Sequence, residues 1–194
     1  MGIFTIVQAR LNSTRLPRKV LLPFKDDKNV LEFLIERIID LNPIIATVNG
    51  AKEITKIAKK YNLRYFEGDE ENVLKRFYLA SVKFGAKDDD LIVRVCSDSP
   101  FLSSELIKEV IKNSKSDYTH NLKDTKGLNV EVFKFRCLKD AYLNAKIDFE
   151  KEHVTPWIKD NCKQKEVSIT KRDDLVLTLD TKEDYIFLKE LNGF

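Results

Sequence analysis

Short apolar segments alternate with segments of helical period over residues 1–113, and this alternation constrains the fold more than any other feature of the chain. The apolar segments are expected to be buried strands, and the segments between them carry apolar residues every three or four positions, as amphipathic helices do. The expected strands span residues 3–7, 44–48, 63–66 and 91–96, and the expected helices span residues 30–41, 51–61, 70–84 and 104–113. This order predicts an α/β fold with a mostly parallel, Rossmann-like sheet covered by helices.

The later part of the chain continues the pattern less regularly. Extended segments are expected at 20–23, 117–121, 129–135, 167–169 and 175–179, and helices at 138–145, 149–161 with an interruption at Pro156, and 181–191. The 194 residues contain no repeat and no linker, which indicates a single domain over residues 1–194. The segment at about 121–161 has the least regular period, and there we expect a substrate-binding insertion or a contact between two copies of the chain.

A basic loop, residues 8–19, follows the first expected strand. It carries three cations, Arg10, Arg15 and Lys19, and the hydroxyl groups of Ser13 and Thr14. A proline in its middle disfavours a helix, so these groups and free backbone N–H groups can converge on one small polyanion. A triphosphate suits such a loop, because it needs several donors and positive charges together. The loop has no glycine and is neither a Walker loop nor a dinucleotide-binding fingerprint. The alternative is a solvated basic turn.

Two carboxylates are expected at the carboxyl ends of strands, where open α/β sheets bind their ligands. Asp98 follows the strand at 91–96, and Asp180 follows the segment at 175–179. Two carboxylates at one sheet edge repel unless a cation joins them. Mg²⁺ is bound by one or two carboxylates together with substrate phosphates and water, which predicts a magnesium–nucleotide site. The alternative is that each aspartate caps the helix that follows it.

Charge and cysteine content restrict the possible partners and the compartment. The 34 basic and 31 acidic residues nearly balance, at a net charge of +3, which disfavours nucleic acid as a partner. No apolar run reaches the length of a membrane span, and the N-terminus enters a strand with no signal-peptide pattern. Cys96, Cys137 and Cys162 are far apart and odd in number, so they predict neither a disulfide framework nor a zinc site. A cytoplasmic protein is expected.

The basic loop reads Q-A-R-L-N-S-T-R-L-P-R-K, and it resembles the signature of the cytidylyltransferases that activate sugars. It is most similar to the branch named after the spore-coat polysaccharide protein SpsF, which is related to the activators of 3-deoxy-octulosonate and sialic acid. Asn12 and Arg18 stand where this family often or usually has glycine. Asparagine tolerates a left-handed backbone, whereas Arg18 would be strained if its position requires a positive φ.

Further segments resemble motifs of the same family, so the resemblance covers essentially the whole chain. These segments are R-V-C-S-D-S-P, L-D-T-K-E-D, F-E-G-D-E-E-N-V-L-K-R-F, G-L-N-V-E-V-F and E-H-V-T-P. The resemblance implies a glycosyltransferase-A-like nucleotidyltransferase fold. It also implies Mg²⁺-dependent transfer from CTP to a hydroxyl of a sugar or sugar acid, with release of pyrophosphate, for polysaccharide or surface-glycan biosynthesis.

The resemblance also implies roles for individual residues. The nucleotide-binding residues would be Ala9, Arg10, Asn12, Ser13, Arg15, Lys19 and, near the base and ribose, Arg76. The metal ligands would be Asp98 and Asp180, and the catalytic groups Arg10, Lys19 and Asp98. For the acceptor sugar, Asn121, Glu131 and His153 are candidates, together with Lys126. A histidine in such a segment is more often a structural hydrogen-bonding residue.

Two other functions remain open at this point. A glycosyltransferase that uses a nucleotide-sugar would need a D-x-D motif after the central strand, and Asp98-Ser99-Pro100 at that place counts against it. A nucleotide-binding module without turnover is the second alternative. The presence of all three loop cations and both aspartates counts against that function.

Overall fold

A computed structural model describes residues 1–169, 172 and 174–191. The described residues form a seven-stranded sheet in the order β5-β4-β1-β6-β8-β7-β9, together with a two-stranded hairpin of β2 and β3. The strands of the sheet are β1 (Ile3–Gln8), β4 (Ile44–Val48), β5 (Tyr65–Gly68), β6 (Leu91–Cys96), β7 (Tyr118–His120), β8 (Glu131–Lys134) and β9 (Gln164–Glu166). Within the sheet, β8 is antiparallel to both of its neighbours, and the other pairings are parallel. The predicted mostly parallel α/β sheet is confirmed.

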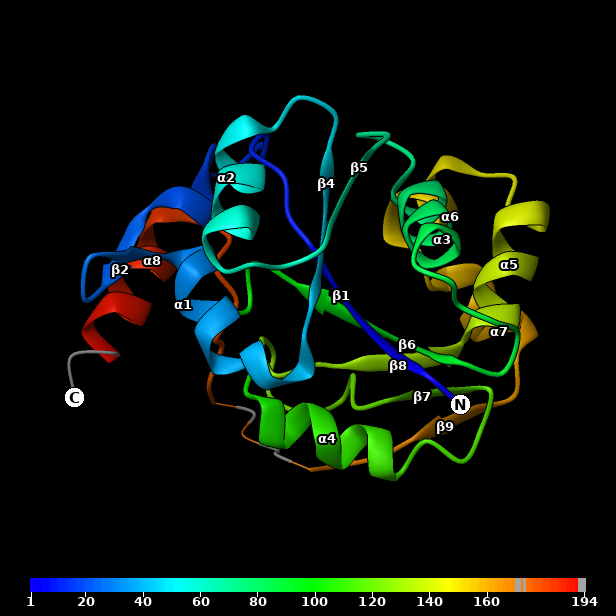
Figure 1. Ribbon diagram of the computed structural model, residues 1–194. Coiled ribbons are helices and arrows are strands. Elements are labelled where there is room, and N and C mark those ends of the chain that lie inside the picture. Colours follow the sequence, from blue (N-terminus) through cyan, green and yellow to red (C-terminus); the bar gives the residue numbers. More distant parts are fainter. Residues whose placement is uncertain (170–171, 173, 192–194) are drawn as a thin grey trace.

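Helices cover both faces of the sheet (Figure 1). They are α1 (Val30–Arg37), α2 (Lys52–Lys60), α3 (Val73–Lys83), α4 (Ser104–Lys112), α5 (Phe135–Asn144), α6 (Asp148–His153), α7 (Pro156–Asn161) and α8 (Lys182–Leu191). The hairpin strands are β2 (Pro23–Lys25) and β3 (Lys28–Asn29), and short 3-10 turns occur at Lys19–Leu21 and Ile39–Leu41. The interruption predicted at Pro156 is confirmed, since α6 ends before this proline and α7 begins at it.

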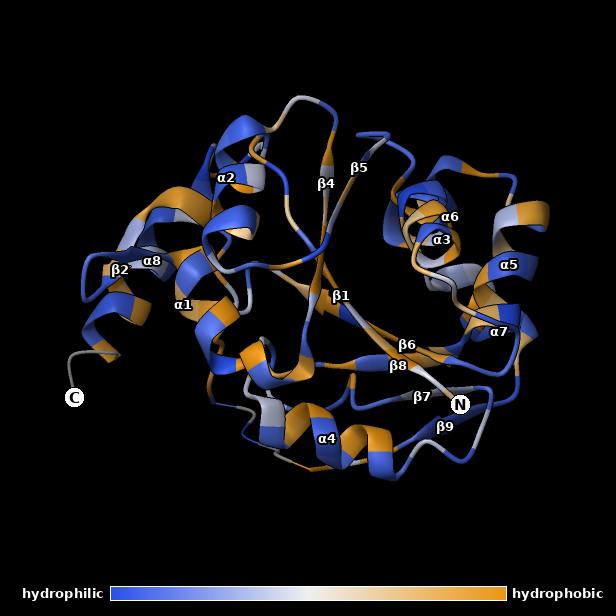
Figure 2. Cartoon of the chain, in the orientation of Figure 1, coloured by the Kyte–Doolittle hydropathy of each residue, from blue (hydrophilic) through white to orange (hydrophobic). Residues whose placement is uncertain are grey.

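Two buried clusters divide the helices between the faces. One cluster joins α1, α2 and α4 to one face of the central strands, and the other joins α3, α5 and α7 to the opposite face. The alternation along β6 shows the division, because Val93 and Val95 belong to the first cluster whereas Ile92 belongs to the second. β1 and β6 are largely hydrophobic, and the loops at their ends are largely hydrophilic (Figure 2). Arg94 and Cys96 therefore point to the face that α3 and α6 cover.

The topology places a crevice beside β1. After β1 the chain adds β4 and β5 on one side, and it then returns to place β6 on the other side of β1. In open α/β sheets, ligands bind at such a switch point, outside the carboxyl ends of the strands. The basic loop leaves β1 at this edge, and Asp98 leaves β6 at the same edge.

Two predicted strands are wrong. Residues 167–169 lie just beyond the short β9: Val167 N–H still donates to the carbonyl of His120 in β7 (2.9 Å), but Ile169 N–H donates to the carboxylate of Asp124 (2.7 Å). Residues 175–179 make a single bridge, between Val176 and Lys126. Their apolar alternation has another cause, since Leu177 and Leu179 pack in a small separate cluster with Leu188 of α8.

Several element boundaries also differ from the prediction. The segment at 20–23 begins in a 3-10 turn, so it is not continuously extended. The third strand lies two residues further along, at Tyr65–Gly68, because Ile45 pairs with Tyr65 in the register. Helix α3 begins at Val73, where the side chain of Asn72 caps it by accepting from Lys75 N–H (2.8 Å). These shifts leave the order of the predicted elements around the crevice unchanged.

Candidate active site

A cavity of about 440 Å³ lies at the carboxyl ends of β1 and β6. It is lined by the basic loop, the start of α3, the end of α6 and the two aspartates predicted to bind a metal. The full lining is Gln8, Ala9, Arg10, Ser13, Thr14, Arg15, Lys19, Val20, Val73, Arg76, Arg94, Cys96, Ser97, Asp98, Glu152, His153 and Asp180. The crevice expected from the topology is therefore rich in both cations and carboxylates.

The basic loop folds back on its own beginning. The carbonyl of Leu11 accepts from Ser13 N–H (3.1 Å) and Arg18 N–H (2.7 Å). Arg18 has φ 59° and ψ 20°, which is the left-handed region, and the 3-10 turn that carries Lys19 begins directly after it. The strain expected from arginine at a glycine position is therefore present, and such a conformation costs about 1–2 kcal/mol for a residue with a Cβ. The turn directs Lys19 into the cavity.

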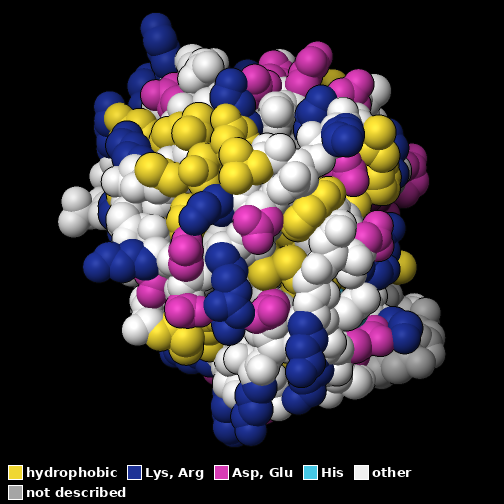
Figure 3. Space-filling view, turned by 90° about the vertical axis from the view of Figure 1, so that its right-hand side faces the viewer, with side chains coloured by type: hydrophobic (Ala, Val, Ile, Leu, Met, Phe, Trp, Pro, Cys, Tyr) yellow, Lys and Arg dark blue, Asp and Glu magenta, His cyan; other side chains and the backbone are white. Residues whose placement is uncertain are grey.

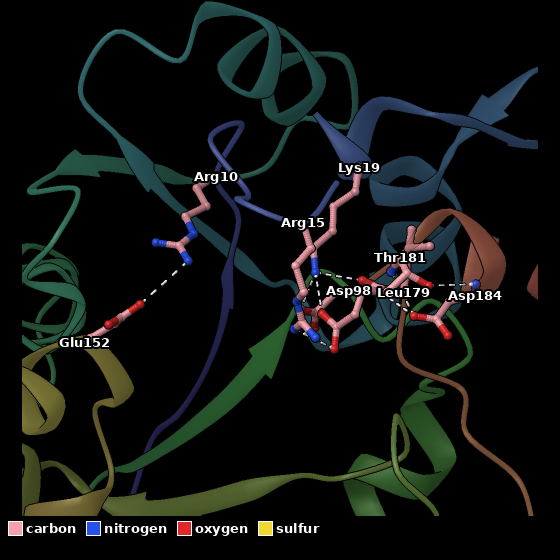
Figure 4. A network of polar contacts seen from close by, with 9 residues as sticks. Arg10, Arg15, Lys19, Asp98, Glu152, Leu179, Thr181 and Asp184 are labelled. Carbon is pink, nitrogen blue, oxygen red and sulfur yellow. Dashed lines mark hydrogen bonds and ion pairs between the residues drawn. The ribbon is translucent and has the colours of Figure 1, made fainter. Parts of the chain in front are cut away.

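Lys19 joins the two aspartates. Its Nζ donates to Asp98 Oδ2 (2.9 Å), to Asp180 Oδ1 (3.0 Å) and to the carbonyl of Leu179 (2.6 Å). Arg15 Nη2 lies 3.0 Å from Asp180 Oδ2. Figure 4 shows the two basic side chains converging on this group of oxygens. Burial alone would raise the pKa of Asp180, but the hydrogen bond from Lys19 and the positive charges around it lower the pKa.

Asp180 reaches the cavity without a strand to carry it. Leu177 N–H donates to the carbonyl of Lys126 (2.7 Å), and Leu179 N–H donates to the carbonyl of Asp98 (2.8 Å). Gly127 permits the close approach, because a Cβ there would lie 2.3 Å from the backbone carbon of Leu177, and its φ of +94° also favours glycine. Two backbone hydrogen bonds and one glycine thus place the second carboxylate.

The residues after Asp180 cap helix α8, so the carboxylate of Asp180 is free to face the cavity. The carboxylate of Asp184 accepts from the N–H groups of Asp180 (3.0 Å) and Thr181 (2.8 Å). Thr181 Oγ1 accepts in turn from Asp184 N–H (3.2 Å). Thr181 and Asp184 therefore form the cap that was the alternative role for Asp180.

A second group of charges lies on the opposite side of the cavity, apart from the aspartates (Figure 4). Arg10 Nη2 is 3.7 Å from Glu152 Oε1 of α6. Arg76 of α3 is 2% exposed, and its Nη1 donates to the carbonyl of Asp69. Burial, followed by the positive charge of Arg10, lowers the pKa of Arg76 to about 10. Among the residues that line this side of the cavity, the two guanidinium groups of Arg10 and Arg76 accompany one carboxylate, that of Glu152.

The floor of the cavity contains a buried ion pair that the sequence did not reveal. Arg94 Nη1 donates to Glu131 Oε2, and Tyr118 Oη donates to Glu131 Oε1 (2.6 Å). Thr155 also makes a hydrogen bond to Glu131. Burial alone would raise the pKa of Glu131, but Arg94, Tyr118 and Thr155 lower it, so the pair stays ionised. Arg94 Nε is buried without a partner among the described residues, and the side chain lines the cavity.

His153 enters the cavity from a strained turn. Val154 has φ 70° and ψ −54°, and Thr155 N–H donates to the carbonyl of His153 (2.8 Å). These values are those of the rarer γ-turn, which is strained for a β-branched residue. Val154 is fully buried, and Thr155 is anchored on Glu131, so packing and hydrogen bonding hold the turn in place. Such strain is typical of functional positions.

Most of the predicted site residues meet at this cavity. Those that line it are Ala9, Arg10, Ser13, Arg15, Lys19, Arg76, Asp98, His153 and Asp180. Four lie elsewhere: Asn12 donates to Glu70 (2.9 Å), Glu131 lies beneath Arg94, and Asn121 is fully buried, accepting from Val130 N–H (2.6 Å). The fourth is Lys126, whose carbonyl accepts from Leu177 N–H.

Eight lining residues were not among the predicted site residues: Gln8, Thr14, Val20, Val73, Arg94, Cys96, Ser97 and Glu152. The available signal was a charged residue inside an otherwise apolar strand, at Arg94. Burial raises the pKa of the Cys96 thiol to about 11, so this residue stays protonated at neutral pH.

The fold and the cavity together define an α/β protein with a charged ligand cavity at the carboxyl edge of its sheet. The family model for cytidylyltransferases matches residues 4–192, and the chain belongs to this family. Its activity is accordingly CTP-dependent sugar nucleotidyl transfer.

Individual relatives are similar to this chain over nearly its whole length. An uncharacterized protein of Methanocaldococcus jannaschii is 37% identical over 98% of this chain and 83% of its own length. The spore coat polysaccharide biosynthesis protein SpsF of Bacillus subtilis is 34% identical over 97% of this chain and 85% of its own length. The structure of a cytidylyltransferase from Leptospira borgpetersenii is similar with a TM-score of 0.91 and 27% identity, over 100% of this chain and 88% of that one.

Proposed function

We propose that the protein transfers the cytidylyl group of CTP to a hydroxyl of a sugar or sugar acid, in a magnesium-dependent reaction that releases pyrophosphate. One observation carries the proposal. The basic loop brings a cation to a position between two carboxylates at the carboxyl edge of the sheet, where Lys19 contacts both Asp98 and Asp180. Cations for phosphates and oxygens for a metal are thus within one cavity.

The oxygens around the Lys19 ammonium fit a magnesium ion. Mg²⁺ takes oxygen ligands and is usually held by one or two carboxylates, with substrate phosphates and water completing the octahedron. Among the described residues, no three His, Cys, Asp or Glu side chains group closely enough to hold a metal alone. Asp98 and Asp180 would therefore share the ion with the phosphates of CTP. When bound, the ion would stabilise the charge that develops on the α-phosphate and help to activate the acceptor hydroxyl.

The loop cations would hold the part of CTP that leaves. The acceptor oxygen forms a bond to the α-phosphorus as the bond from this phosphorus to pyrophosphate breaks. Arg10, Arg15 and Lys19 would neutralise the β- and γ-phosphates, and Ala9 and Ser13 also line the cavity. Arg76 would lie nearer the nucleoside. Positioning and electrostatics supply most of the rate in such reactions, so no covalent nucleophile is required.

The acceptor would bind over Arg94 and His153. Because Glu131 holds one side of the Arg94 guanidinium, the rest of the group is kept in one orientation, as a donor for a sugar oxygen. Glu131 and Asn121 were predicted to contact the acceptor directly. Their side chains instead bond to Arg94 and to the backbone N–H of Val130, so we assign the acceptor contact to Arg94 and His153. The curated relatives include a protein named for spore coat polysaccharide biosynthesis and several named 3-deoxy-manno-octulosonate cytidylyltransferases, which supports a sugar or sugar acid and a surface polysaccharide as its destination.

We also propose that the protein works in the cytoplasm and that two copies of the chain associate. All three cysteines are free thiols, which suits a reducing compartment. No helix within the described ranges has both the length and the hydrophobicity needed to cross a membrane. On the face shown in Figure 3, hydrophobic patches lie among charges of both signs. Leu143, Ile147 and Phe149 in the segment of α5 and α6 are more than half exposed, which supports a contact between copies there.

Pyrophosphate release tests the proposal. Each of the four nucleoside triphosphates is incubated with a panel of sugars and sugar acids that includes 3-deoxy-manno-octulosonate, with and without Mg²⁺. We expect release with CTP and one class of acceptor, dependent on Mg²⁺, and none when the sugar is omitted. Equal release from all four triphosphates, or full release after removal of divalent metal by EDTA, would contradict it.

A further inference from the structure

The position of Lys19 has a consequence for the order in which ligands enter the cavity. Its side chain is 10% exposed, and its three acceptors are the two carboxylates and a backbone carbonyl. All three are the kind of oxygen that a hard divalent cation binds. The ammonium therefore occupies the place where the proposed magnesium ion would bind.

Two cations cannot share these oxygens. A lysine ammonium and a divalent ion a few ångströms apart repel strongly in a partly buried site. Within the described part of the chain, Arg15 is the second basic residue in contact with Asp180, and Asp98 forms its ion pair with Lys19 alone. The ammonium thus neutralises two neighbouring carboxylates that would otherwise repel each other.

We propose that Lys19 is the resting occupant of the metal position, and that a divalent ion enters only together with nucleotide phosphates that draw the ammonium away. This inference rests on the proposed function for the identity of the nucleotide. Phosphate oxygens offer the ammonium a new charged partner at the moment when the divalent ion takes over its carboxylates. A metal ion without nucleotide lacks that exchange and must displace a buried ion pair.

The local structure permits this change of partner. Lysine has a flexible four-carbon stem, so its ammonium can move by rotation about side-chain bonds while the backbone stays in place. The neighbouring Arg15 is 65% exposed and can follow the same phosphates. Asp98 and Asp180 stay in position when Lys19 moves. The hydrogen bond from Leu179 N–H to the carbonyl of Asp98 does not involve Lys19, and neither does the hydrogen bond from Asp180 N–H to Asp184.

Binding of Mn²⁺ to the nucleotide-free protein tests the inference, with the free ion measured by electron paramagnetic resonance. Lys19→Met removes the ammonium, and we expect it to bind one Mn²⁺ at least about tenfold more tightly than the wild type. Lys19→Gln keeps hydrogen bonding without charge and should behave in the same way if the methionine variant folds poorly. Lys28→Met is the matched control, because it removes a lysine paired with Glu36 (2.9 Å), and it should bind Mn²⁺ as the wild type does.

The location of the new ion is checked by adding Asp98→Asn to Lys19→Met, which should abolish the gain. Equal Mn²⁺ affinity of the wild type and both Lys19 variants would overturn the inference, and so would a gain that survives Asp98→Asn. These outcomes do not depend on turnover. If no sugar releases pyrophosphate but the Lys19 variants gain Mn²⁺ as expected, the proposed acceptor reaction fails while this inference stands.

Discussion

The cavity contains two groups of paired charges of opposite character, one partly buried and one buried. At the phosphate side, Lys19 bridges Asp98 and Asp180, whose side chains are 28% and 17% exposed. At the floor, Arg94 is bound to Glu131, whose side chain is 5% exposed and is also held by Tyr118 and Thr155. The first pair can exchange its partners for those of a substrate, whereas the second cannot separate without leaving a buried carboxylate unpaired.

This difference indicates a division of labour. A site that must accept a highly charged triphosphate and release pyrophosphate needs cations that change partners at little cost. A site that selects an acceptor needs donors whose direction is fixed, because a site built to bond a substrate oxygen strongly rejects a molecule that lacks it. We therefore propose that the exchangeable pair serves the nucleotide and the fixed pair the acceptor.

The largest effect is expected from Asp98→Asn at the exchangeable pair. The amide keeps the shape but loses the charge that a metal ligand needs, so turnover should fall on the order of a thousandfold. Pyrophosphate release measures the loss, and circular dichroism should show an unchanged fold. Asp40→Asn, which removes a carboxylate paired with Lys108 at the surface, is the control and should keep full activity. Wild-type turnover in Asp98→Asn would remove the metal assignment.

A smaller but more selective effect is expected at the fixed pair. Arg94→Lys retains a cation for Glu131 but loses the remaining guanidinium nitrogens at the cavity floor. The ratio kcat/KM for the acceptor should fall by about ten- to a hundredfold, the loss of one or two hydrogen bonds to a charged donor. The dissociation constant of CTP, measured by calorimetry without acceptor, should not change.

His153→Ala and Glu131→Ala extend this test to the strained turn and the positioning carboxylate. Both should raise the KM for the acceptor or lower kcat while CTP affinity stays constant. Lower thermal stability with unchanged acceptor kinetics in both variants would show that the segment is only structural. A parallel loss of CTP affinity in Arg94→Lys would place Arg94 in the nucleotide site and contradict the division of labour between the two groups of charges.

The two sides of the cavity also differ in how far the sequence predicted them. Arg10, Arg15 and Lys19 lie within one loop, and Asp98 directly follows a strand, so local pattern and the general behaviour of α/β sheets brought them together. The pairing of Arg94 with Glu131 depends on the register of β6 against β8, two residues 37 positions apart in the chain. Side-chain period does not specify which strand lies next to which.

The predictions that were wrong have the same origin. Leu177 and Leu179 alternate as in a strand, yet they pack against α8 and contribute one bridge to the sheet. Asn121 looked suited to a sugar because it is polar, but its amide fastens the backbone at Leu128 and Val130. A polar residue in an irregular segment satisfies buried backbone groups as often as it meets a ligand, and only the folded neighbours decide between these roles.

An intermediate effect is expected from Arg15→Ala, which tests whether the exchangeable side reaches the outer phosphates. Because Arg15 is largely exposed, its loss should weaken CTP binding by about tenfold, the lower range for a charge-assisted contact. CMP binding should change much less, since CMP has no β- or γ-phosphate. Calorimetric titration with both nucleotides measures the difference, and Arg136→Ala, on a distant surface pair with Asp117, is the control. Equal losses for CTP and CMP would contradict the assignment.

The smallest effect is expected from Arg18→Gly, at the strained residue directly before Lys19. Glycine adopts the left-handed conformation without the cost of about 1–2 kcal/mol that a Cβ imposes, but it loses about 0.5–1 kcal/mol through the greater freedom of the unfolded chain. The pair of Arg18 with Glu53 (3.0 Å) is exposed on both sides, so its loss costs little. The variant should therefore be as stable as the wild type or more stable by up to about 1 kcal/mol, measured by urea unfolding.

Asn62→Gly serves as the comparison, because Asn62 has φ 53° at the end of α2, far from the cavity, and asparagine already tolerates this conformation. Asn62→Gly should gain less stability to urea unfolding than Arg18→Gly does. CTP affinity of Arg18→Gly should equal that of the wild type, since glycine allows the same turn and Lys19 remains. A loss of both stability and CTP affinity would show that the Arg18 side chain itself holds the loop in shape. The loop that carries Lys19 would then be held more rigidly than we propose, and it would resemble the fixed pair of Arg94 and Glu131.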